Sequence, residues 1–205
     1  MSWNEFQSLT DFNSSLQKVR VVVRDRNVVL PAEGLKMAIK MIQAVDQTAK
    51  KVALVGNGGS AAIASHQAVD LWKNGGIRAT AFNDSSLLTC LANDCGYENV
   101  FSKSIEMFCD PGDLVIAISS SGKSENILNA VRSARLRGCS VITLSGFKPD
   151  NPLSAMGDLN FYVPSERYGT VEVAHLLLIH AAIDEVIALK QKEVKSRQQR
   201  QEMSL

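Results

Sequence analysis

The chain has 205 residues, of which 45% are hydrophobic and 21% charged, so it is long enough and apolar enough to bury one full core. Its 22 basic and 21 acidic residues leave a formal net charge of +1, which gives no electrostatic basis for binding nucleic acid or a membrane surface. The composition excludes a disordered chain and a small domain that depends on disulfides for its stability.

The first part of the chain, residues 1–50, is predicted to be helical. Apolar residues recur at three- and four-residue intervals along 6–19 and again from residue 35. Pro31 and Gly34 separate the two helices. The β-branched run from Val19 to Val23 leaves the end of the first helix open.

From residue 51 the pattern changes to short apolar runs that alternate with segments of helical period. The runs are too short for helices and contain no polar interruption, as expected of strands that are covered on both faces. Alternating strands and helices predict parallel strands joined by right-handed crossovers, and hence a doubly wound α/β fold. The predicted strands are 52–55, 79–82, 114–118, 141–144 and 161–163, and the clearest helices are 60–73, 124–137 and 171–190.

The last segment, 191–205, is polar and mixed in charge, and it either extends the final helix or frays. The N-terminus has no basic stretch followed by an apolar one, and no apolar run approaches the length of a membrane span. These features predict a soluble cytoplasmic protein.

Two turns at predicted strand ends have residues suited to binding an anion. Ligands of an open parallel sheet lie beyond the carboxyl ends of its strands. The glycine turn, 56–60 (GNGGS), either lets a ligand approach the backbone closely at the start of a helix or is only a tight connection. The serine turn, 119–124 (SSSGKS), brings four hydroxyls to the start of another helix, which suits a phosphate monoester or serves only as a helix cap. Neither turn has the glycine spacing of a nucleotide-binding loop.

The three histidines, His66, His175 and His180, all fall in predicted helices. Asp70 follows His66 by four residues on the same helix face, and Glu172 and His180 lie about 80° apart and two turns along the last helix. If the two helices meet, His66, Asp70, Glu172 and His180 suit either a divalent metal such as zinc or general acid–base chemistry. His175 lies about 140° from His180 and is predicted to be a packed or hydrogen-bonded helix residue.

These turns and histidines resemble the sugar isomerase (SIS) domain, and within it the phosphoheptose isomerase family. The resemblance extends over nearly the whole chain, from the N-terminal helices to about residue 190. The matching stretches are GNGGS at 56–60, AND-x-GY at 92–97, PGD at 111–113, ISSSGKS at 118–124, VP at 163–164 and E-x-x-H-x-x-x-x-H at 172–180.

The resemblance implies a five-stranded parallel sheet in a flavodoxin-like order, with the SIS domain over 51–190. It implies a homotetramer in which the N-terminal segment 1–50 packs into a central bundle. The implied reaction is an aldose–ketose isomerisation, from sedoheptulose 7-phosphate to a heptose 7-phosphate or a close analogue used in cell-surface or specialised sugar biosynthesis. A zinc ion is expected near His66 and His180. The expected substrate-binding residues are Asn57, Gly58, Gly59, Ser60, Asp94, Ser119, Ser120, Ser121 and Ser124.

Two positions depart from the family pattern, which has Glu where Asp70 stands and Gln where Glu172 stands. Because Asp70 is one methylene shorter, a proton-abstracting carboxylate there would be displaced, at a cost of about a hundredfold in rate. The two changes can compensate each other. Our hypothesis is that His66, Asp70, Glu172 and His180 bind zinc, that Glu172 or Asp70 is the base, and that His180 transfers the other proton.

Two further readings remain open at this point. A non-catalytic SIS protein, either a phosphosugar sensor or an adaptor, could keep the two turns while lacking an acid–base set. A phosphosugar lyase or etherase could use the same turns with a carboxylate. The presence of two histidines and two carboxylates favours the isomerase.

Overall fold

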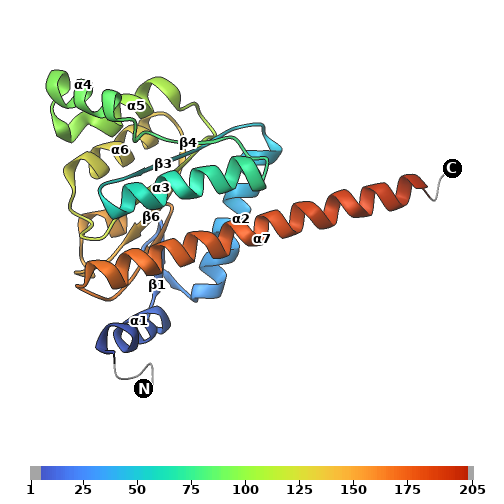
Figure 1. Ribbon diagram of the computed structural model, residues 1–205, viewed down its shortest axis with the longest axis horizontal. Helices are drawn as coiled ribbons and strands as arrows, with labels where there is room; N and C mark the ends of the chain where they lie inside the picture. Colours follow the sequence, from blue (N-terminus) through green and yellow to red (C-terminus); the bar gives the residue numbers. More distant parts are fainter. Residues whose placement is uncertain (1–5, 203–205) are drawn as a thin grey trace.

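A seven-stranded sheet in the order β2-β1-β7-β6-β5-β3-β4 forms the centre of the computed structural model, which describes residues 6–202 (Figure 1). Five of its strands are parallel and coincide with the five predicted runs, and their order is the flavodoxin-like one, so this prediction is confirmed. Every residue of β3 and β5 is buried, because helices cover both faces of the sheet. The parallel strands are β3 (Val52–Gly56), β4 (Ala79–Ala81), β5 (Leu114–Ser119), β6 (Ser140–Ser145) and β7 (Leu159–Tyr162).

The N-terminal part contributes two more strands to the same sheet. β1 (Arg20–Val23) pairs antiparallel with β7 and with β2 (Val28–Val29), between α1 (Gln7–Gln17) and α2 (Pro31–Gln47). The prediction of helix throughout 1–50 is therefore wrong for residues 20–29, and two antiparallel strands extend the predicted five-stranded parallel sheet. The valine run favours a strand because β-branched side chains lose rotamer freedom in a helix and pack well on a sheet. Residues 1–5 lie outside the described part of the chain.

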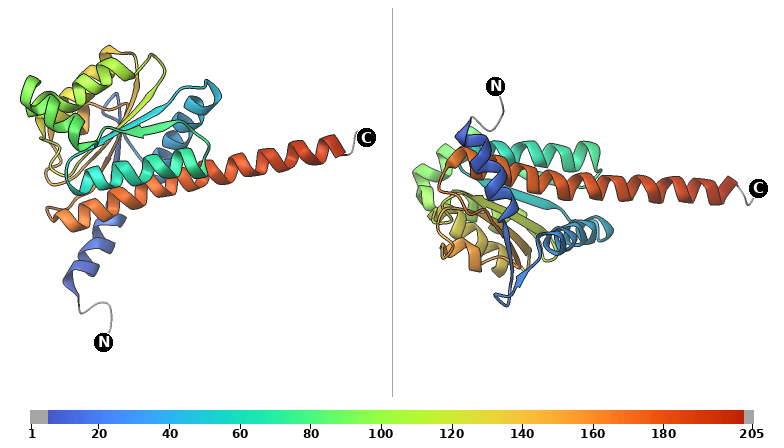
Figure 2. Two further views of the ribbon diagram at one scale, coloured as in Figure 1. Left: turned by 45° about the horizontal axis from the view of Figure 1, so that its top comes forward. Right: turned by 90° about the horizontal axis from the view of Figure 1, so that it is seen from below.

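The helices form one layer on each face of the sheet (Figure 2). The helices α2, α3 and α7 pack on one face, whereas α5 and α6 pack on the other with α4 beside them. The predicted helices around 60–73, 124–137 and 171–190 are confirmed as α3, α6 and α7. The remaining helical elements are α3 (Gly59–Val69), η2 (Asp70–Asn74), α4 (Ser85–Cys95), η3 (Tyr97–Asn99), α5 (Val100–Phe108), α6 (Glu125–Leu136), η4 (Pro152–Ala155) and α7 (Tyr168–Glu202).

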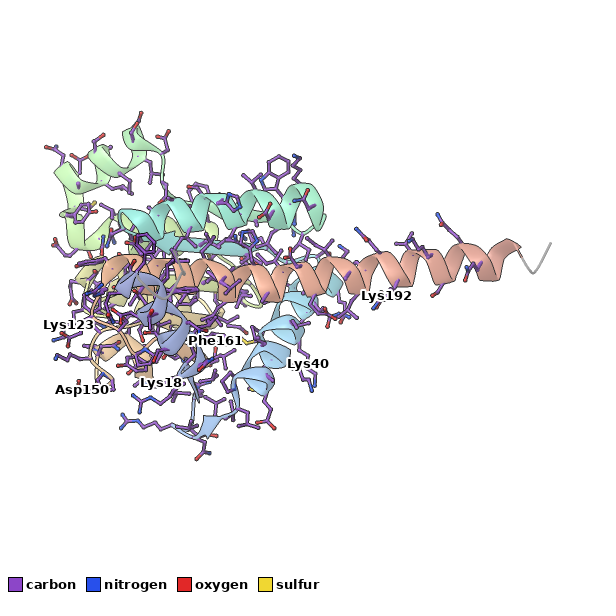
Figure 3. The ribbon with its side chains drawn as sticks, turned by 60° about the horizontal axis from the view of Figure 1, so that its bottom comes forward. Lys18, Lys40, Lys123, Asp150, Phe161 and Lys192 are labelled. Atoms are coloured by element: carbon purple, nitrogen blue, oxygen red, sulfur yellow. The ribbon has the colours of Figure 1, made fainter. Side chains whose placement is uncertain are left out.

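The last helix, α7, has 35 residues, and its final part leaves the body of the molecule. Its first part is anchored by buried residues such as Val171, Ile183 and Val186. Residues 191–196 are exposed, and Lys192 extends away from the body in Figure 3. The polar segment therefore continues the helix as far as Glu202, and 203–205 lie outside the described residues. Among residues 6–202, no helix is both long enough and apolar enough to cross a membrane.

Candidate functional site

The two turns predicted separately from the sequence open at the same edge of the sheet. Gly56, at the end of β3, pairs with Ile118 near the end of β5, and the strand order reverses between these two strands. This is the position at which open parallel sheets bind ligands. α3 begins within the glycine turn, at Gly59, and α6 begins directly after the serine turn, so two helix N-termini contribute free amide groups here.

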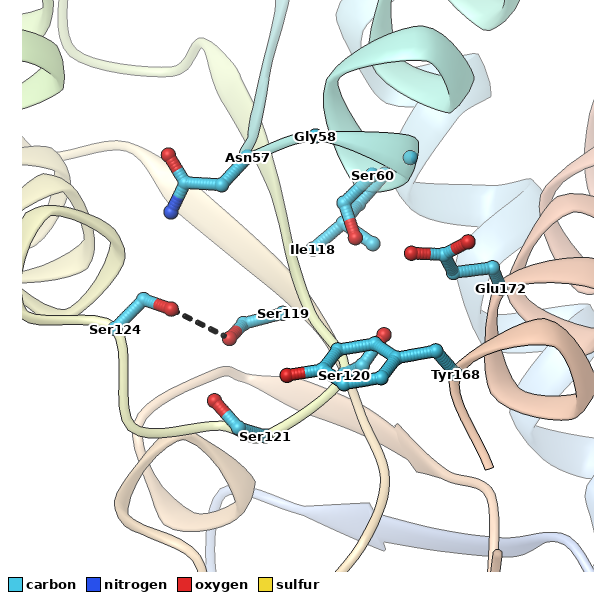
Figure 4. Close-up of a pocket in the computed structure, with 11 residues that line it drawn as sticks. Asn57, Gly58, Ser60, Ile118, Ser119, Ser120, Ser121, Ser124, Tyr168 and Glu172 are labelled. Carbon is cyan, nitrogen blue, oxygen red and sulfur yellow. Dashed lines mark hydrogen bonds between the residues drawn. The ribbon is translucent and has the colours of Figure 1, made fainter. Parts of the chain in front are cut away.

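A pocket of about 260 Å³ lies between the two turns and the start of α7 (Figure 4). Glu172 extends its carboxylate from α7 toward Ser60, and the ring of Tyr168 borders the pocket. All the predicted substrate-binding residues except Asp94 line it. The lining consists of Asn57, Gly58, Gly59, Ser60, Ile118, Ser119, Ser120, Ser121, Ser124, Tyr168 and Glu172.

The serine turn places one unpaired hydroxyl in the pocket wall. Ser119 and Ser120 are each only 5% exposed. The Ser119 hydroxyl donates to Ser124 Oγ at 3.3 Å and accepts the Gly122 N–H at 3.2 Å. Ser120 Oγ has no hydrogen-bond partner among the described residues. Because an unpaired buried polar group costs about 1–3 kcal/mol, its position in a pocket wall indicates a group that pairs with a ligand.

The two glycines of the first turn serve different purposes. Gly58 has φ +53°, a conformation that side chains other than glycine rarely adopt. At Gly59 a Cβ would overlap the carboxylate of Glu172. Gly59 therefore allows α7 to bring Glu172 against the glycine turn.

Asn57 is held in one orientation by side chains outside the pocket. Its amide exchanges two hydrogen bonds with that of Asn126 on α6, each 2.9 Å long. The Tyr97 hydroxyl also donates to Asn57 Oδ1, at 3.0 Å. We did not predict Asn126 as part of the site, because its pairing with Asn57 spans 69 residues and has no local signal.

A second group of side chains, which could hold a metal ion, lies where α7 runs beside α3 and η2. His66 Nε2 is 3.2 Å from Asp70 Oδ2, and His180 Nδ1 is 3.7 Å from the same oxygen. One donor atom from each of the three residues lies within 4.8 Å of the others. Asn74 Nδ2 donates to the other oxygen of Asp70 at 3.0 Å and so orients the carboxylate. The two helices therefore meet, which is the condition that the sequence left open. We refer to His66, Asp70 and His180 as the histidine cluster.

Glu172 does not belong to the histidine cluster, although the sequence suggested it as a fourth ligand. It lines the pocket instead. Eight residues separate it from His180, which is about 12 Å along the helix axis. Of the two candidate bases, Glu172 therefore lies in the pocket and Asp70 lies in the cluster.

Two other polar residues lie away from the pocket. Asp94 is exposed on α4, where it accepts hydrogen bonds from Asn93 Nδ2 and Cys90 Sγ, so the single chain does not bring it to the site as predicted. The face of α4 that bears Asp94 is exposed. His175 is buried, as predicted, and its Nε2 donates to the Ser145 carbonyl at 3.1 Å. Burial lowers the pKa of His175 to about 4, against the opposing effect of this hydrogen bond, so the ring is neutral.

Comparison with known proteins gives consistent matches. Residues 17–146 match the family model of the SIS domain. The phosphoheptose isomerase of Campylobacter concisus is 40% identical over 163 residues, which are 74% of this chain and 85% of that protein. The phosphoheptose isomerase of Helicobacter hepaticus is 36% identical over 181 residues, which are 85% and 89% of the two chains. The solved structure of the Neisseria gonorrhoeae phosphoheptose isomerase has a TM-score of 0.76 and 31% identity, and the match covers 86% of this chain and 94% of that one.

The SIS family and the isomerase reading from the sequence are both confirmed by these matches. The SIS match includes both turns. These relatives, which match most of the chain, carry the name of an enzyme, and this favours an enzyme over an adaptor or sensor. The chain belongs to the phosphoheptose isomerase family of SIS-domain proteins and is an aldose–ketose isomerase of phosphosugars.

Proposed function

We propose that the protein interconverts sedoheptulose 7-phosphate, or a close phosphosugar analogue, and the corresponding aldose by moving a proton between C1 and C2. The pocket between the two turns is the observation that carries this proposal. It combines two helix N-termini and a buried, unpaired serine hydroxyl, which suit a phosphate group, with the carboxylate of Glu172. The choice of a seven-carbon sugar rests on the relatives that are named phosphoheptose isomerases.

Binding and proton transfer are assigned to different parts of the pocket. The serine turn holds the phosphate and so fixes the sugar chain, which supplies the proximity part of catalysis. Glu172 removes the proton from the carbon next to the carbonyl and returns it to the neighbouring carbon, through an enediol. We choose Glu172 over Asp70 because it is the carboxylate among the residues that line the pocket. His180, predicted as the second proton-transfer group, is not among the residues that line the pocket, so we assign it to the histidine cluster instead.

The histidine cluster fits a zinc ion. Two imidazoles and one carboxylate form a three-ligand set that zinc sites commonly use. In this assignment His66, Asp70 and His180 are the ligands, and Asn74 orients Asp70. A zinc ion there would supply Lewis-acid polarisation of an oxygen atom that reached it. The shorter Asp70 is compatible with this role because its carboxylate already lies near both imidazoles.

We further propose that the protein acts in the cytoplasm, as the sequence predicts, and that it is a homotetramer, as the family resemblance implies. An apolar groove of about 560 Å³ between α1 and the start of α7 supports self-association. Leu9, Val173 and Leu177 are partly exposed along this face. A second copy would remove this apolar surface from water. Light scattering on the purified protein should give a mass four times that of the chain.

Proton NMR in heavy water tests the proposed reaction. Purified protein is incubated with a panel of C6 and C7 sugar phosphates that includes sedoheptulose 7-phosphate, with and without zinc. We expect deuterium at C1 or C2 of one sugar together with a new aldose signal. Binding shifts without exchange or conversion would contradict the enzyme and favour a phosphosugar sensor or adaptor.

A further inference from the structure

A buried asparagine outside the pocket lies directly behind the serine turn. Asn151 is 1% exposed and immediately precedes η4. Its Nδ2 donates to Ser145 Oγ at 3.3 Å and to the Lys148 carbonyl at 2.7 Å, and its Oδ1 accepts the Ser154 N–H at 3.0 Å. These bonds fix the side chain in one orientation.

The side chain of Asn151 packs against Gly122, the residue at which the serine turn reverses direction. A Cβ at Gly122 would overlap the Asn151 amide, so the two residues are in close contact. Gly122 has φ +63°, and its N–H donates to the Ser119 carbonyl at 3.1 Å. Its own carbonyl accepts the Leu153 N–H, also at 3.1 Å. Asn151 and Leu153 therefore hold the outer side of the turn, opposite the pocket.

The position of Gly122 determines where the pocket hydroxyls lie. Gly122 stands between Ser121 and Ser124, and both of these serines line the pocket. If Gly122 shifted, the two hydroxyls that flank it would no longer converge on one point. Asn151 itself is not among the residues that line the pocket.

The same buried polar network reaches the helix that carries the proposed base. Ser145 pairs with Ser119 across the sheet, and its hydroxyl accepts from both Asn151 and Asn160. Its carbonyl accepts from His175 Nε2, which lies one helical turn after Glu172 on α7. The network therefore joins the back of the serine turn to the segment of α7 that bears Glu172.

We propose that Asn151 is a positioning residue for the phosphate-binding turn: it holds Gly122 from behind and so directs the serine hydroxyls into the pocket without touching the substrate. This inference rests on the proposed function, because it takes the serine turn as the phosphate site. The alternative is that the Asn151 side chain only caps η4, since its Oδ1 accepts the Ser154 N–H.

Two substitutions separate these roles. Asn151→Ala removes the cap and the contact with Gly122, whereas Asn151→Ser keeps an oxygen that can cap η4 but loses the amide against Gly122. We expect both variants to raise the Kd for inorganic phosphate and the KM for the sugar phosphate about tenfold, with kcat and zinc content within about threefold of wild type. Asn129→Ala is the matched control, because Asn129 donates to the Glu98 carbonyl away from the turn, and it should leave all four quantities unchanged.

A double-variant cycle tests the contact directly. Gly122→Ala alone should weaken phosphate binding, because its Cβ meets Asn151 and its φ is positive. Asn151→Ala makes room for that Cβ, so the double variant should bind phosphate more tightly than the two single effects predict. If Asn151→Ala does not fold, Asn151→Ser takes its place in the cycle.

Three outcomes would overturn the positioning role. They are full phosphate affinity in a folded Asn151 variant, rescue of affinity by Asn151→Ser, and strictly additive effects in the cycle. Phosphate binding by the wild-type protein is measured first, since a wild-type protein that binds neither inorganic phosphate nor a sugar phosphate would disprove the proposed function and the positioning role together.

Discussion

Two buried polar residues at opposite ends of the parallel sheet, Asp113 and Ser120, differ in how they are paired. At the amino end, Asp113 is fully buried and bonded within the chain: it accepts from the Asp110 N–H at 2.7 Å and pairs with Lys51 Nζ at 2.6 Å. At the carboxyl end, Ser120 is buried in a pocket wall and its hydroxyl has no partner among the described residues. Asp113 therefore stabilises the fold, whereas Ser120 keeps a hydroxyl available for a ligand.

The pKa of Asp113 reflects this internal pairing. Burial alone would raise it, but the hydrogen bonds from Asp110 and Lys51, together with the Lys51 charge, outweigh burial and lower the pKa below its usual value of 3.8. The carboxylate is therefore ionised throughout the neutral range. Its contribution to stability is present above pH 3.8 and is lost as the pH falls through the lowered pKa.

The largest effect on stability is expected from breaking the amino-end pair. Asp113→Asn should lower the free energy of unfolding by about 3 kcal/mol, because the Asp110 N–H and the Lys51 ammonium lose the buried carboxylate with which they pair. Asp46→Asn is the matched control, since Asp46 forms a partly exposed pair with Lys190 at 2.8 Å and should cost less than about 1 kcal/mol. Urea unfolding measures both. Equal costs would show that the amino end has no special role in stability.

A pH titration should separate the two ends. His175, near the carboxyl end, has a pKa lowered from 6.5 to about 4, so the unfolded chain binds a proton that the folded chain does not. Stability should therefore fall by up to about 3 kcal/mol as the pH drops from 6.5 to 4, before Asp113 begins to titrate. His175→Gln can still donate to the Ser145 carbonyl but does not titrate, so it should remove this slope. An unchanged slope in that variant would assign the effect to other groups.

The smallest effect on stability is expected at Ser120. Ser120→Ala should weaken phosphate binding about tenfold and change the free energy of unfolding by less than about 1 kcal/mol, because the hydroxyl has no partner to lose. Isothermal titration with inorganic phosphate and urea unfolding measure the two quantities. A large loss of stability with unchanged phosphate affinity would show instead that the Ser120 hydroxyl stabilises the fold and does not bind phosphate.

The sequence predicted the parts of the fold that depend on local pattern. Fully buried parallel strands such as 114–118 are continuous apolar runs, and the glycine and serine turns are visible as motifs. The β-branched run at 19–23 was the local signal for β1, but its antiparallel pairing with β7 joins residues about 140 positions apart and could not be read from the sequence.

The site could be predicted only in part for a similar reason. Helical angles showed that Glu172 and His180 share a face, but they did not show which of the two would reach the histidine cluster and which the pocket. That distinction depends on which part of α7 lies beside His66 and Asp70. The role of Asn151 depends on contacts with a turn 29 residues away, so it also could not be read from spacing.

The most direct test of the central claim compares Glu172→Gln with Asp70→Asn in heavy water, using the sugar phosphate that the wild-type protein converts. We predict that Glu172→Gln slows proton exchange at C1 and C2 by about 10²–10⁴-fold while the variant keeps its zinc and its phosphate affinity. Asp70→Asn should lose zinc. Full turnover and full metal content in both variants would contradict the division of roles between the pocket and the histidine cluster.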